Sequence, residues 1–331
     1  MAVLIAENPT YVDWMESLDP DGQVAAVIEL LNQTNEILMN LTMIEGNLPT
    51  GNQTTVRTGL PTATWRRLYG GVPDSKSSRA TVIESVGMLE AYNEIDKDLA
   101  DLNGNGAAFR MSEARATVEG MNQNLASTLF YGNTTTNPER FDGFAVRYNS
   151  LGASNGENII DAGGTGTDNA SIWLVVWHPD TCFGLVPKGS SAGLSVTDKG
   201  QETLLDSAGN KYEGYRMHFQ LKAGLCVKDW RYVVRIANID RSALTSDAAT
   251  GANLPNLMFE AMERLPGVMS GARMAWYMDR SIRTKFRQQL ASLTKQSTLE
   301  YQNVGGHRVS MWDEVPIHRV DVLSPDEARV V

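Results

Sequence analysis

Residues 53–88 read QTTVRTGLPTATWRRLYGGVPDSKSSRATVIESVGM, and this stretch predicts the most distinctive element of the fold. Its segments 54–58 and 65–69 have the β-branched and aromatic composition of strands, 70–75 has that of a turn, and 78–86 predicts the returning strand. This segment has too few apolar residues to bury one face of a hairpin, and an isolated two-stranded ribbon is only marginally stable in water. We therefore expect a long β-hairpin that packs on something outside itself, and a partner subunit is the natural candidate.

The hairpin mixes arginines with aromatic residues, a composition that is enriched in protein–protein interfaces. It is equally compatible with an ordinary strand. If the hairpin forms an interface, the residues expected to contact another subunit are Arg57, Trp65, Arg66, Arg67 and Tyr69.

The segments on either side of the hairpin show helical and strand periodicity. Apolar residues recur at helical spacing over 23–41, 109–132, 254–265 and 271–293. The middle of the chain, 159–239, is mostly β: residues 215–222 alternate apolar and polar, and the apolar run 172–177 predicts a strand covered on both faces. Residues 315–322 predict a closing strand.

Charge is distributed unevenly along the chain. The net charge is −10, with 29 Lys and Arg against 39 Asp and Glu, which argues against a nucleic-acid binder. No basic residue precedes Arg57, whereas eight acidic residues do: Glu7, Asp13, Glu16, Asp19, Asp21, Glu29, Glu36 and Glu45. Such a segment favours docking on an Arg-bearing surface of the same or a neighbouring subunit, or forms a solvated acidic face.

One predicted helix, 271–293, carries a stripe of arginines opposite its apolar face. The stripe consists of Arg273, Arg280, Arg283 and Arg287. It is either a solvated polar face, a seam between subunits, or a contact for nucleic-acid backbone. The negative total charge favours the contact between subunits; a DNA-binding structural protein that works through this stripe is an alternative function.

The residues that could carry catalysis are few. His178 and Cys182 could form a thiolate nucleophile, which makes a Cys/His hydrolase a second alternative, but no orienting third residue or oxyanion-hole loop is apparent nearby. The four histidines lack metal-ligand spacing, and residues 163–167 lack the lysine of a phosphate loop. We expect no catalytic residue, no metal and no cofactor, and two buried free thiols at Cys182 and Cys226. The longest apolar run is too short to span a membrane, and the N-terminus lacks the features of a secretory signal.

Motifs along the chain follow a recognisable order. The acidic leading segment precedes 64–72 (TWRRLYGGV) and 81–86 (TVIESV); a long helix then ends at 129–133 (LFYGN), before 138–144 (PERFDGF). In this order they resemble the major capsid proteins of tailed phages with the Hong Kong 97-like coat fold. Residues 269–290 and 309–317 are similar to the axial-domain helix and returning strand of that family. The β-rich segment 159–239 is a departure, because it is longer than the family arrangement leads us to expect.

The resemblance implies an α+β coat fold in which the hairpin reaches over a neighbouring subunit and the long helix is the spine of the peripheral domain. The expected division is an N-terminal arm and helix (1–50), an extended hairpin loop (51–100), a spine helix and peripheral domain (101–160), an axial domain with a β-rich insertion (161–315), and a return strand and tail (316–331).

The function that the resemblance implies is structural. The chain is expected to self-assemble, as pentamers and hexamers, into the icosahedral head of a tailed phage, and to have no enzymatic activity. Expected partners are other copies of itself, a cement or decoration protein, a separate scaffolding protein, the portal, and packaged double-stranded DNA bound without sequence specificity; no membrane is involved. Assembly is expected in the host bacterial cytoplasm, and the final location is the virion.

Overall fold

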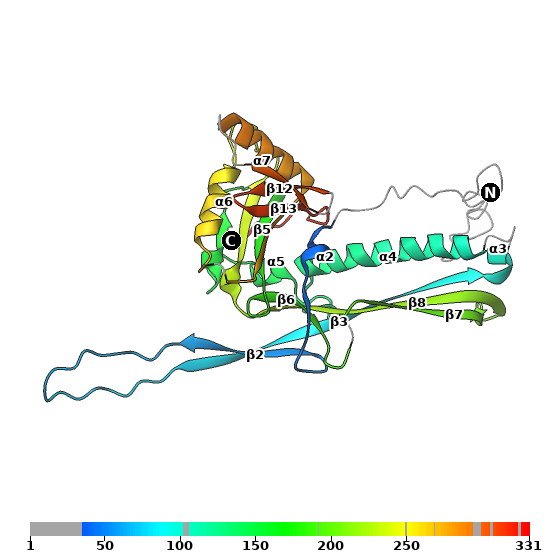
Figure 1. The fold of residues 1–331 in the computed structure, drawn as a ribbon, viewed down its shortest axis with the longest axis horizontal. Coiled ribbons are helices and arrows are strands. Elements are labelled where there is room, and N and C mark those ends of the chain that lie inside the picture. The colour runs from blue at the N-terminus through cyan, green and yellow to red at the C-terminus, as the bar shows by residue number, and fades with distance from the viewer. Residues whose placement is uncertain are drawn as a thin grey trace.

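The computed structural model describes residues 35–101, 106–190, 192–248, 250–267, 269–293, 299–304, 307–323 and 326–331. Three parts can be distinguished in Figure 1. A central body holds β5 (Asn169–Trp177), β12 (His307–Trp312), β13 (Val315–Arg319), α6 (Leu254–Glu263) and α7 (Arg280–Leu293). A limb extends to one side and is formed by α4 (Gly106–Tyr131), β7 (Leu194–Leu205), β8 (Lys211–Val227) and the second half of β3 (Ser78–Asp96). A hairpin, formed by β2 (Gly51–Gly59) and the first half of β3, extends to the other side.

The helices are α2 (Ile37–Asn40), α3 (Lys97–Asp101), α4 (Gly106–Tyr131), α5 (Phe144–Arg147), α6 (Leu254–Glu263) and α7 (Arg280–Leu293), with 3-10 turns η2 (Gly156–Asn158) and η3 (Trp230–Tyr232). The strands are β1 (Met43–Glu45), β2 (Gly51–Gly59), β3 (Ser78–Asp96), β4 (Ile159–Asp161), β5 (Asn169–Trp177), β6 (Cys182–Val186), β7 (Leu194–Leu205), β8 (Lys211–Val227), β9 (Val233–Asp240), β10 (Arg273–Met278), β11 (Leu299–Val304), β12 (His307–Trp312) and β13 (Val315–Arg319).

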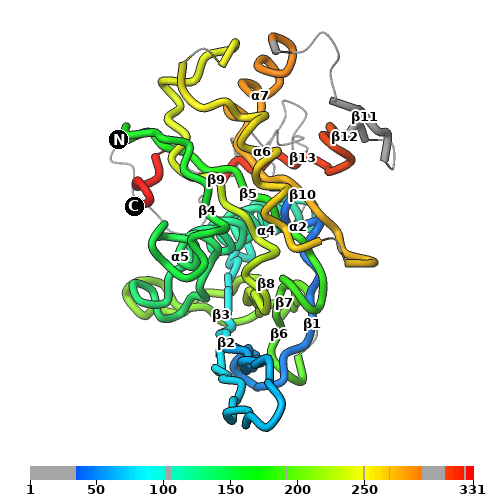
Figure 2. The backbone as a smooth tube through the Cα atoms, turned by 90° about the vertical axis from the view of Figure 1, so that its left-hand side faces the viewer, coloured from blue at the N-terminus to red at the C-terminus, as the bar shows by residue number. Residues whose placement is uncertain are grey.

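Hydrogen bonding joins these strands into one extended sheet. Its main path runs β11-β12-β13-β10-β5-β6-β8-β3-β2, and β1, β4, β7 and β9 branch from it. The path therefore begins in the body, crosses into the limb and ends in the hairpin. Figure 2 views the chain at a right angle to Figure 1 and shows β2 at one end of the molecule and α7 at the other.

The body is held together through β5, which is buried on both faces. Alternate residues enter different cores: Trp173, Val175 and Trp177 pack with the end of α4 and with α5, whereas Ile172 and Leu174 pack under α6 and α7. A strand that is covered on both faces has a continuous apolar sequence, which explains why the sequence pattern predicted β5.

The limb consists of α4 lying on β3 and β8. Its own small core includes Ala114, Met121 and Phe219, with Leu89 and Met217 at the edges. The helix ends before Gly132, whose amide donates to the carbonyl of Thr128 at 2.9 Å. A Cβ at Gly132 would lie 2.2 Å from the carbonyl oxygen of Phe141, so only glycine allows this close approach.

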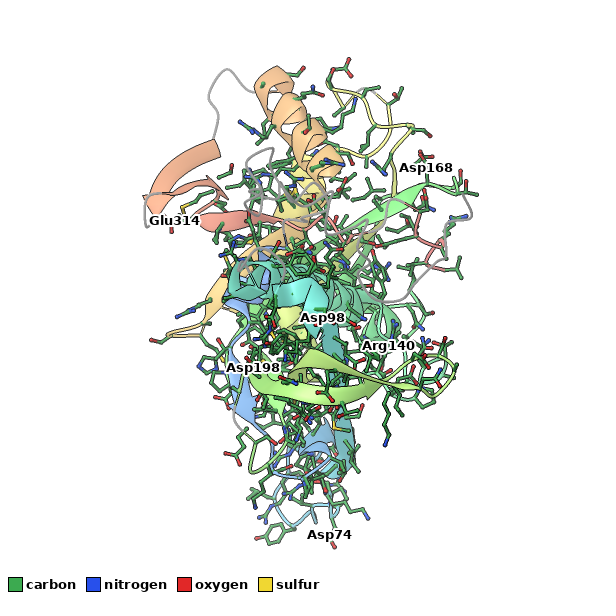
Figure 3. The ribbon with its side chains drawn as sticks, turned by 90° about the vertical axis from the view of Figure 1, so that its right-hand side faces the viewer. Asp74, Asp98, Arg140, Asp168, Asp198 and Glu314 are labelled. Atoms are coloured by element: carbon green, nitrogen blue, oxygen red, sulfur yellow. The ribbon has the colours of Figure 1, made fainter. Side chains whose placement is uncertain are left out.

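The hairpin and the limb share one strand. Residues 78–85 of β3 pair with β2, and residues 86–96 pair with β8. This continuity fixes the direction in which the hairpin leaves the body. Figure 3 shows Asp74, in the loop that closes the hairpin, at the opposite extremity from the upper body, where Asp168 lies.

Most of the sequence predictions of individual elements are confirmed. These are the hairpin, the long helix (now 106–131), the two-sided strand β5, the alternating strand within β8, the helix α6 and the closing strand β13. The mixed helix-and-sheet fold class is also confirmed. The predicted helix over 23–41 lies mostly outside the described residues; within them, α2 covers four residues.

Two predictions were wrong. Residues 65–69 are not a strand, because the pairing of β2 with β3 ends at Gly59 and Ser78 and no partner lies beyond. The segment 271–293 is not one helix: Arg273–Met278 is β10, hydrogen-bonded between β5 and β13, and the helix begins only at Arg280.

Candidate assembly surfaces

The tip of the hairpin carries the most exposed large side chains among the described residues. Trp65 and Tyr69 are fully exposed, and Leu60 and Leu68 are nearly so. Arg66 and Arg67 lie in the same exposed loop. Large apolar side chains gathered on one protruding loop are typical of an interaction site. The structure thus brings together the hairpin residues that the sequence singled out for contact, with Arg57 further back on β2.

The backbone at the tip is tightly turned. Tyr69 has φ 64°, in the left-handed region that side chains other than glycine rarely adopt, and the Gly70 amide donates to the carbonyl of Arg67 at 3.1 Å. The turn holds Trp65 and Tyr69 outward without any contact that covers them. The left-handed conformation of Tyr69 costs about 1–3 kcal/mol, which is offset only if the surroundings favour it.

The shaft of the hairpin is basic. Arg57 on β2 lies directly opposite Arg79 on β3, and both side chains are exposed. Like charges placed directly opposite each other on a sheet repel. The arrangement therefore favours an anionic group lying across the shaft.

The root of the hairpin is fixed by a largely buried ion pair. Arg147, at the end of α5, donates to both carboxylate oxygens of Glu84 on β3, at 2.6 and 2.5 Å. Arg147 also donates to the carbonyls of Asp142 and Leu225, at 3.2 and 3.3 Å. Burial opposes the charge on Arg147, but the bonds and attraction from Glu84 outweigh it and raise the pKa of the guanidinium. The pair ties the strand that forms the hairpin to the body.

Sequence reasoning missed this pair. Glu84 and Arg147 are 63 residues apart, and each stands alone in an otherwise unremarkable segment. The only available signal was a single carboxylate in the mostly uncharged run 81–86. Nothing in the sequence names its partner.

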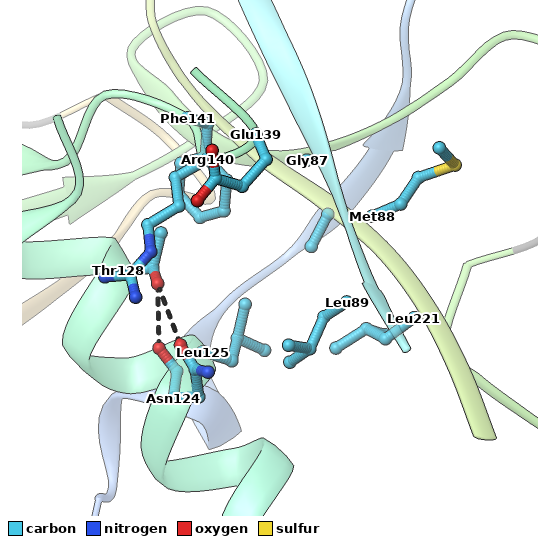
Figure 4. A pocket seen from close by; sticks show the side chains of 11 residues that line it. Gly87, Met88, Leu89, Asn124, Leu125, Thr128, Glu139, Arg140, Phe141 and Leu221 are labelled. Atoms are coloured by element: carbon cyan, nitrogen blue, oxygen red, sulfur yellow. Dashed lines mark hydrogen bonds between the residues drawn. The ribbon is translucent and has the colours of Figure 1, made fainter. Parts of the chain in front are cut away.

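A hollow of about 230 Å³ opens between α4 and β3 beside this root (Figure 4). Leu89, Leu125 and Leu221 form its apolar side, and Thr128 donates to the backbone carbonyl of Asn124 at 2.9 Å. A second, more apolar hollow of about 480 Å³ lies on the limb, lined by residues that include Met111, Val196 and Phe219. Both offer surface for packing and contain no arrangement of nucleophile and base.

The arginines predicted to share one helical face do not all do so. Arg273 lies on β10, so the predicted four-residue stripe is wrong, because backbone pairing with β5 overrides the helical pattern. Arg280, Arg283 and Arg287 lie on α7 at spacings of three and four residues, and therefore on one side. Arg283 reaches β12, where it donates to the hydroxyl of Ser310 at 2.8 Å.

The described chain begins beside β13. Asn35 forms a bridge with Val320, and the Glu36 carboxylate lies 2.7 Å from Nδ1 of His318. Burial tends to raise the pKa of Glu36, but its bonds with His318 and with the Arg319 amide outweigh this, so the pKa is lowered. A few residues on, Asn40 donates to the hydroxyl of Tyr277 at 3.0 Å.

The Cys/His pair does not resemble a catalytic site. Cys182 is completely buried in the main core, and burial raises the pKa of its thiol far above the ordinary value, which disfavours the thiolate. Nδ1 of His178 accepts a bond from the Asp180 amide at 3.2 Å, within the turn that follows β5. Cys226 is also a buried free thiol.

The described residues offer neither a metal site nor a membrane-spanning helix. No cluster of three or more His, Cys, Asp or Glu side chains that could hold a metal ion is found there. In the same part of the chain, no helix is both long enough and apolar enough to cross a membrane.

Comparison with known proteins places these surfaces in context. A family model described as Major capsid protein GP7 matches residues 19–331. A chain in the validated near-atomic resolution structure of bacteriophage epsilon15 is 30% identical, with a TM-score of 0.80 over 100% of this chain and 99% of that one. The bacteriophage JBD30 capsid matches at 10% identity and a TM-score of 0.49, over 93% of this chain and 99% of that one. No match was found among curated proteins.

Proposed function

Because the chain belongs to the Major capsid protein GP7 family and is a major capsid protein of a tailed phage with the Hong Kong 97-like fold, we propose that its hairpin is the element exchanged between neighbouring subunits of the shell. The observation that carries this is the full exposure of Trp65 and Tyr69 at the end of a hairpin whose root is rigidly held. The paired shaft, which ends at Gly59 and Ser78, fixes the direction in which the loop 60–77 projects, and this reduces the entropy lost when a partner covers the aromatic residues.

The geometry of the subunit supports exchange with a neighbour. The hairpin and the limb extend from opposite sides of the body (Figure 1), so the tip cannot reach the apolar hollow of its own limb near Met111 and Val196. A contact between two different surfaces is heterologous, and repeating it generates a closed ring when the rotation closes. Rings of five and six subunits, as pentamers and hexamers, are the closures that an icosahedral shell needs.

Charge supports the same arrangement. Arg57, Arg66, Arg67 and Tyr69 present cations and a hydroxyl along the hairpin, and the chain as a whole carries a charge of −10. A basic arm is attracted to the acidic surface of another copy. On this account Arg57, Trp65, Arg66, Arg67 and Tyr69 contact the next subunit, whereas Arg273, which lies on β10, stands apart from the arginines of α7. Each contact can be weak, since many copies act together.

The shell is an assembly of many copies, and its place is the virion. We propose that assembly takes place in the host cytoplasm, with a scaffolding protein, a portal and a decoration protein as partners, around double-stranded DNA that is bound without sequence specificity. The domain division given by the family resemblance (1–50, 51–100, 101–160, 161–315 and 316–331) is retained as part of this proposal.

We also propose that the protein has no enzymatic activity. The support is the burial of Cys182 and the raised pKa of its thiol. A Cys182→Ala variant should form shells and support infection like the unmodified protein. Shells that form normally but fail to yield infectious particles would point to a chemical role for this thiol.

Electron microscopy of the chain, produced alone and then together with the products of neighbouring genes, tests the assembly proposal. We expect closed shells of uniform diameter in at least one of these preparations. In such shells, density for residues 60–77 should lie on the adjacent subunit. Density in which the hairpin folds back on its own limb would refute the exchange.

A further inference from the structure

Helix α4 connects the limb to the body. Near its end, Leu129 and Phe130 are fully buried in the main core, and Tyr131 is its last residue. The helix has 26 residues. At 1.5 Å per residue it is about 39 Å long, so a rotation of about 5° at Tyr131 moves its far end, in the limb, by about 3 Å. A small change at this junction therefore becomes a large change in the position of the limb.

Apolar packing alone does not fix the angle of so long a helix. Phe130 contacts Phe144, Trp173 and Tyr277, with ring centroids 5.9–6.4 Å apart. The hydrophobic effect that drives such contacts has no preferred direction. A core that keeps its volume and its apolar pattern loses its unique arrangement before it loses stability. A defined limb angle therefore requires a directional contact at the same junction.

Tyr131 makes a directional contact of this kind. Its hydroxyl donates to Oε1 of Glu327 at 2.6 Å. The body holds this carboxylate in place, because Oε2 accepts from Nη2 of Arg235 at 2.7 Å and from the hydroxyl of Ser171. The Glu327 amide also donates to the carbonyl of Asn169 at 2.8 Å. The last residue of α4 thus bonds to an acceptor that β5 and β9 hold still.

The segment that carries Glu327 is attached to the body at a second point. The Val330 amide donates to Oδ1 of Asn238 at 2.8 Å, and the Val330 carbonyl accepts from Nδ2 of the same side chain at 2.9 Å. Beside this segment lies a hollow of about 470 Å³, lined in part by Tyr131 and Ala145. The segment is therefore fixed, whereas the Tyr131 ring has space to shift when its hydroxyl bond is removed.

We propose that Tyr131 is a positioning residue for shell assembly. Its bond to Glu327 sets the angle at which the limb leaves the body, and this angle sets the curvature of the shell. When neighbours repeat one contact between two different surfaces, the rotation from one copy to the next follows from where those surfaces lie on the subunit. The effect on the shell rests on the proposed exchange between neighbours, whereas the limb angle is a property of the single subunit.

A distance measured in the unassembled subunit tests the angle. Tyr131→Phe removes the hydroxyl and keeps the ring. Spin labels are placed on Asp98→Cys, exposed in α3 at the far end of the limb (Figure 1), and on Asn256→Cys, exposed on α6 in the body. The native thiols of Cys182 and Cys226 are buried and should stay unlabelled. We expect a single narrow distance distribution when Tyr131 is present, and a broadened or shifted one in Tyr131→Phe.

Tyr148→Phe is the matched control. It also removes one hydroxyl from the main core, but this hydroxyl donates to the carbonyl of Trp230 at 2.7 Å and so joins two segments of the body. The limb distance should stay unchanged in this variant. In electron micrographs, the unmodified chain and Tyr148→Phe should form shells of one diameter, whereas Tyr131→Phe should form shells of mixed diameters.

Several results would overturn the proposal. An unchanged narrow distance in Tyr131→Phe is one. Equal broadening in Tyr131→Phe and Tyr148→Phe is another, because the loss of any core hydroxyl would then loosen the limb. Failure of Tyr131→Phe to fold would show that the hydroxyl is required for folding and does not merely set the angle. A changed distance with shells of one diameter would refute the link to curvature. If the unmodified chain formed no shells, the proposed function would fail, yet the distance in the subunit would still decide the role of Tyr131.

Discussion

Arg235 on β9 and Glu327 near the end of the chain form an ion pair in the interior of the body, with Nη2 of Arg235 donating to Oε2 of Glu327 at 2.7 Å. Their side chains are only 4% and 5% exposed. The other oxygen of Glu327 accepts from the hydroxyl of Tyr131 at 2.6 Å, at the end of α4. The C-terminal segment is thereby fixed to both the central sheet and the long helix of the limb.

The first prediction concerns this pair. Glu327→Gln should destabilise the unassembled subunit by about 3–5 kcal/mol, because the charge of Arg235 would stay buried without its partner. Denaturation by urea measures the change. Arg329→Gln, an exposed substitution two residues on, should change stability by no more than about 0.5 kcal/mol. If the two variants were equally stable, the claim that the pair of Arg235 and Glu327 stabilises the body would be wrong.

The second prediction concerns the root of the hairpin. Glu84→Gln should loosen it, since Arg147 would lose the carboxylate that offsets its burial; the expected cost is about 3–5 kcal/mol. Hydrogen exchange in β2 should rise more than exchange in β10. Glu94→Gln is the comparison: Glu94 lies on the same strand as Glu84 and forms a partly exposed pair with Arg216 on β8, and its loss should cost about 1 kcal/mol or less. Uniform loosening of the whole chain by Glu84→Gln would contradict a local role.

The third prediction separates folding from assembly. Trp65→Ala and Tyr69→Ala should leave the melting temperature of the subunit unchanged, because both side chains are fully exposed. Each should raise the protein concentration required for assembly by about tenfold, as expected for an aromatic residue that a partner buries. Light scattering against concentration gives this threshold. Met39→Ala, which changes another exposed apolar residue that lies outside the hairpin, should not move this threshold. A lowered melting temperature with normal assembly would reverse the interpretation.

The fourth prediction concerns pH. The pKa of Glu36 is lowered in the folded chain, so this carboxylate contributes stability that is fully present above its unfolded pKa and is lost as the pH falls through the folded one. Acidification through that window should therefore release α2 from β13. Amide exchange at residues 35–41 should rise there, and the Glu36→Gln variant should lack this dependence. A rise that is equally large in the variant would place the titrating group elsewhere.

Periodicity allowed much of the fold to be predicted from sequence. Apolar residues recur at helical spacing in α4 and alternate with polar ones over residues 215–222 of β8, whereas β5 stands out as a continuous apolar run. The segment 271–293 was predicted less well. The apolar residues Ala275, Met278, Ile282 and Phe286 happen to keep helical spacing across the boundary at Arg280, while pairing with β5 and β13 converts the first part into a strand.

The assembly surfaces were predictable only where composition reveals them. The aromatic and basic tip of the hairpin stands out in the sequence, and the structure shows it exposed. The ion pairs of Glu84 with Arg147 and of Glu327 with Arg235 depend on contacts between residues 63 and 92 positions apart, which no local pattern encodes. The environment created by the fold, and not the residue type, gives these carboxylates their role.

The most direct test of exchange through the hairpin is to replace residues 60–77 with a two-residue Asn-Gly turn and to examine the purified chain by negative-stain electron microscopy. Because β2 and β3 would still be joined in register and the root pair of Glu84 and Arg147 kept, the subunit should fold with unchanged stability. We predict folded subunits that form no closed shells under conditions in which the unmodified chain does. Shells of normal size from the shortened chain would contradict the account.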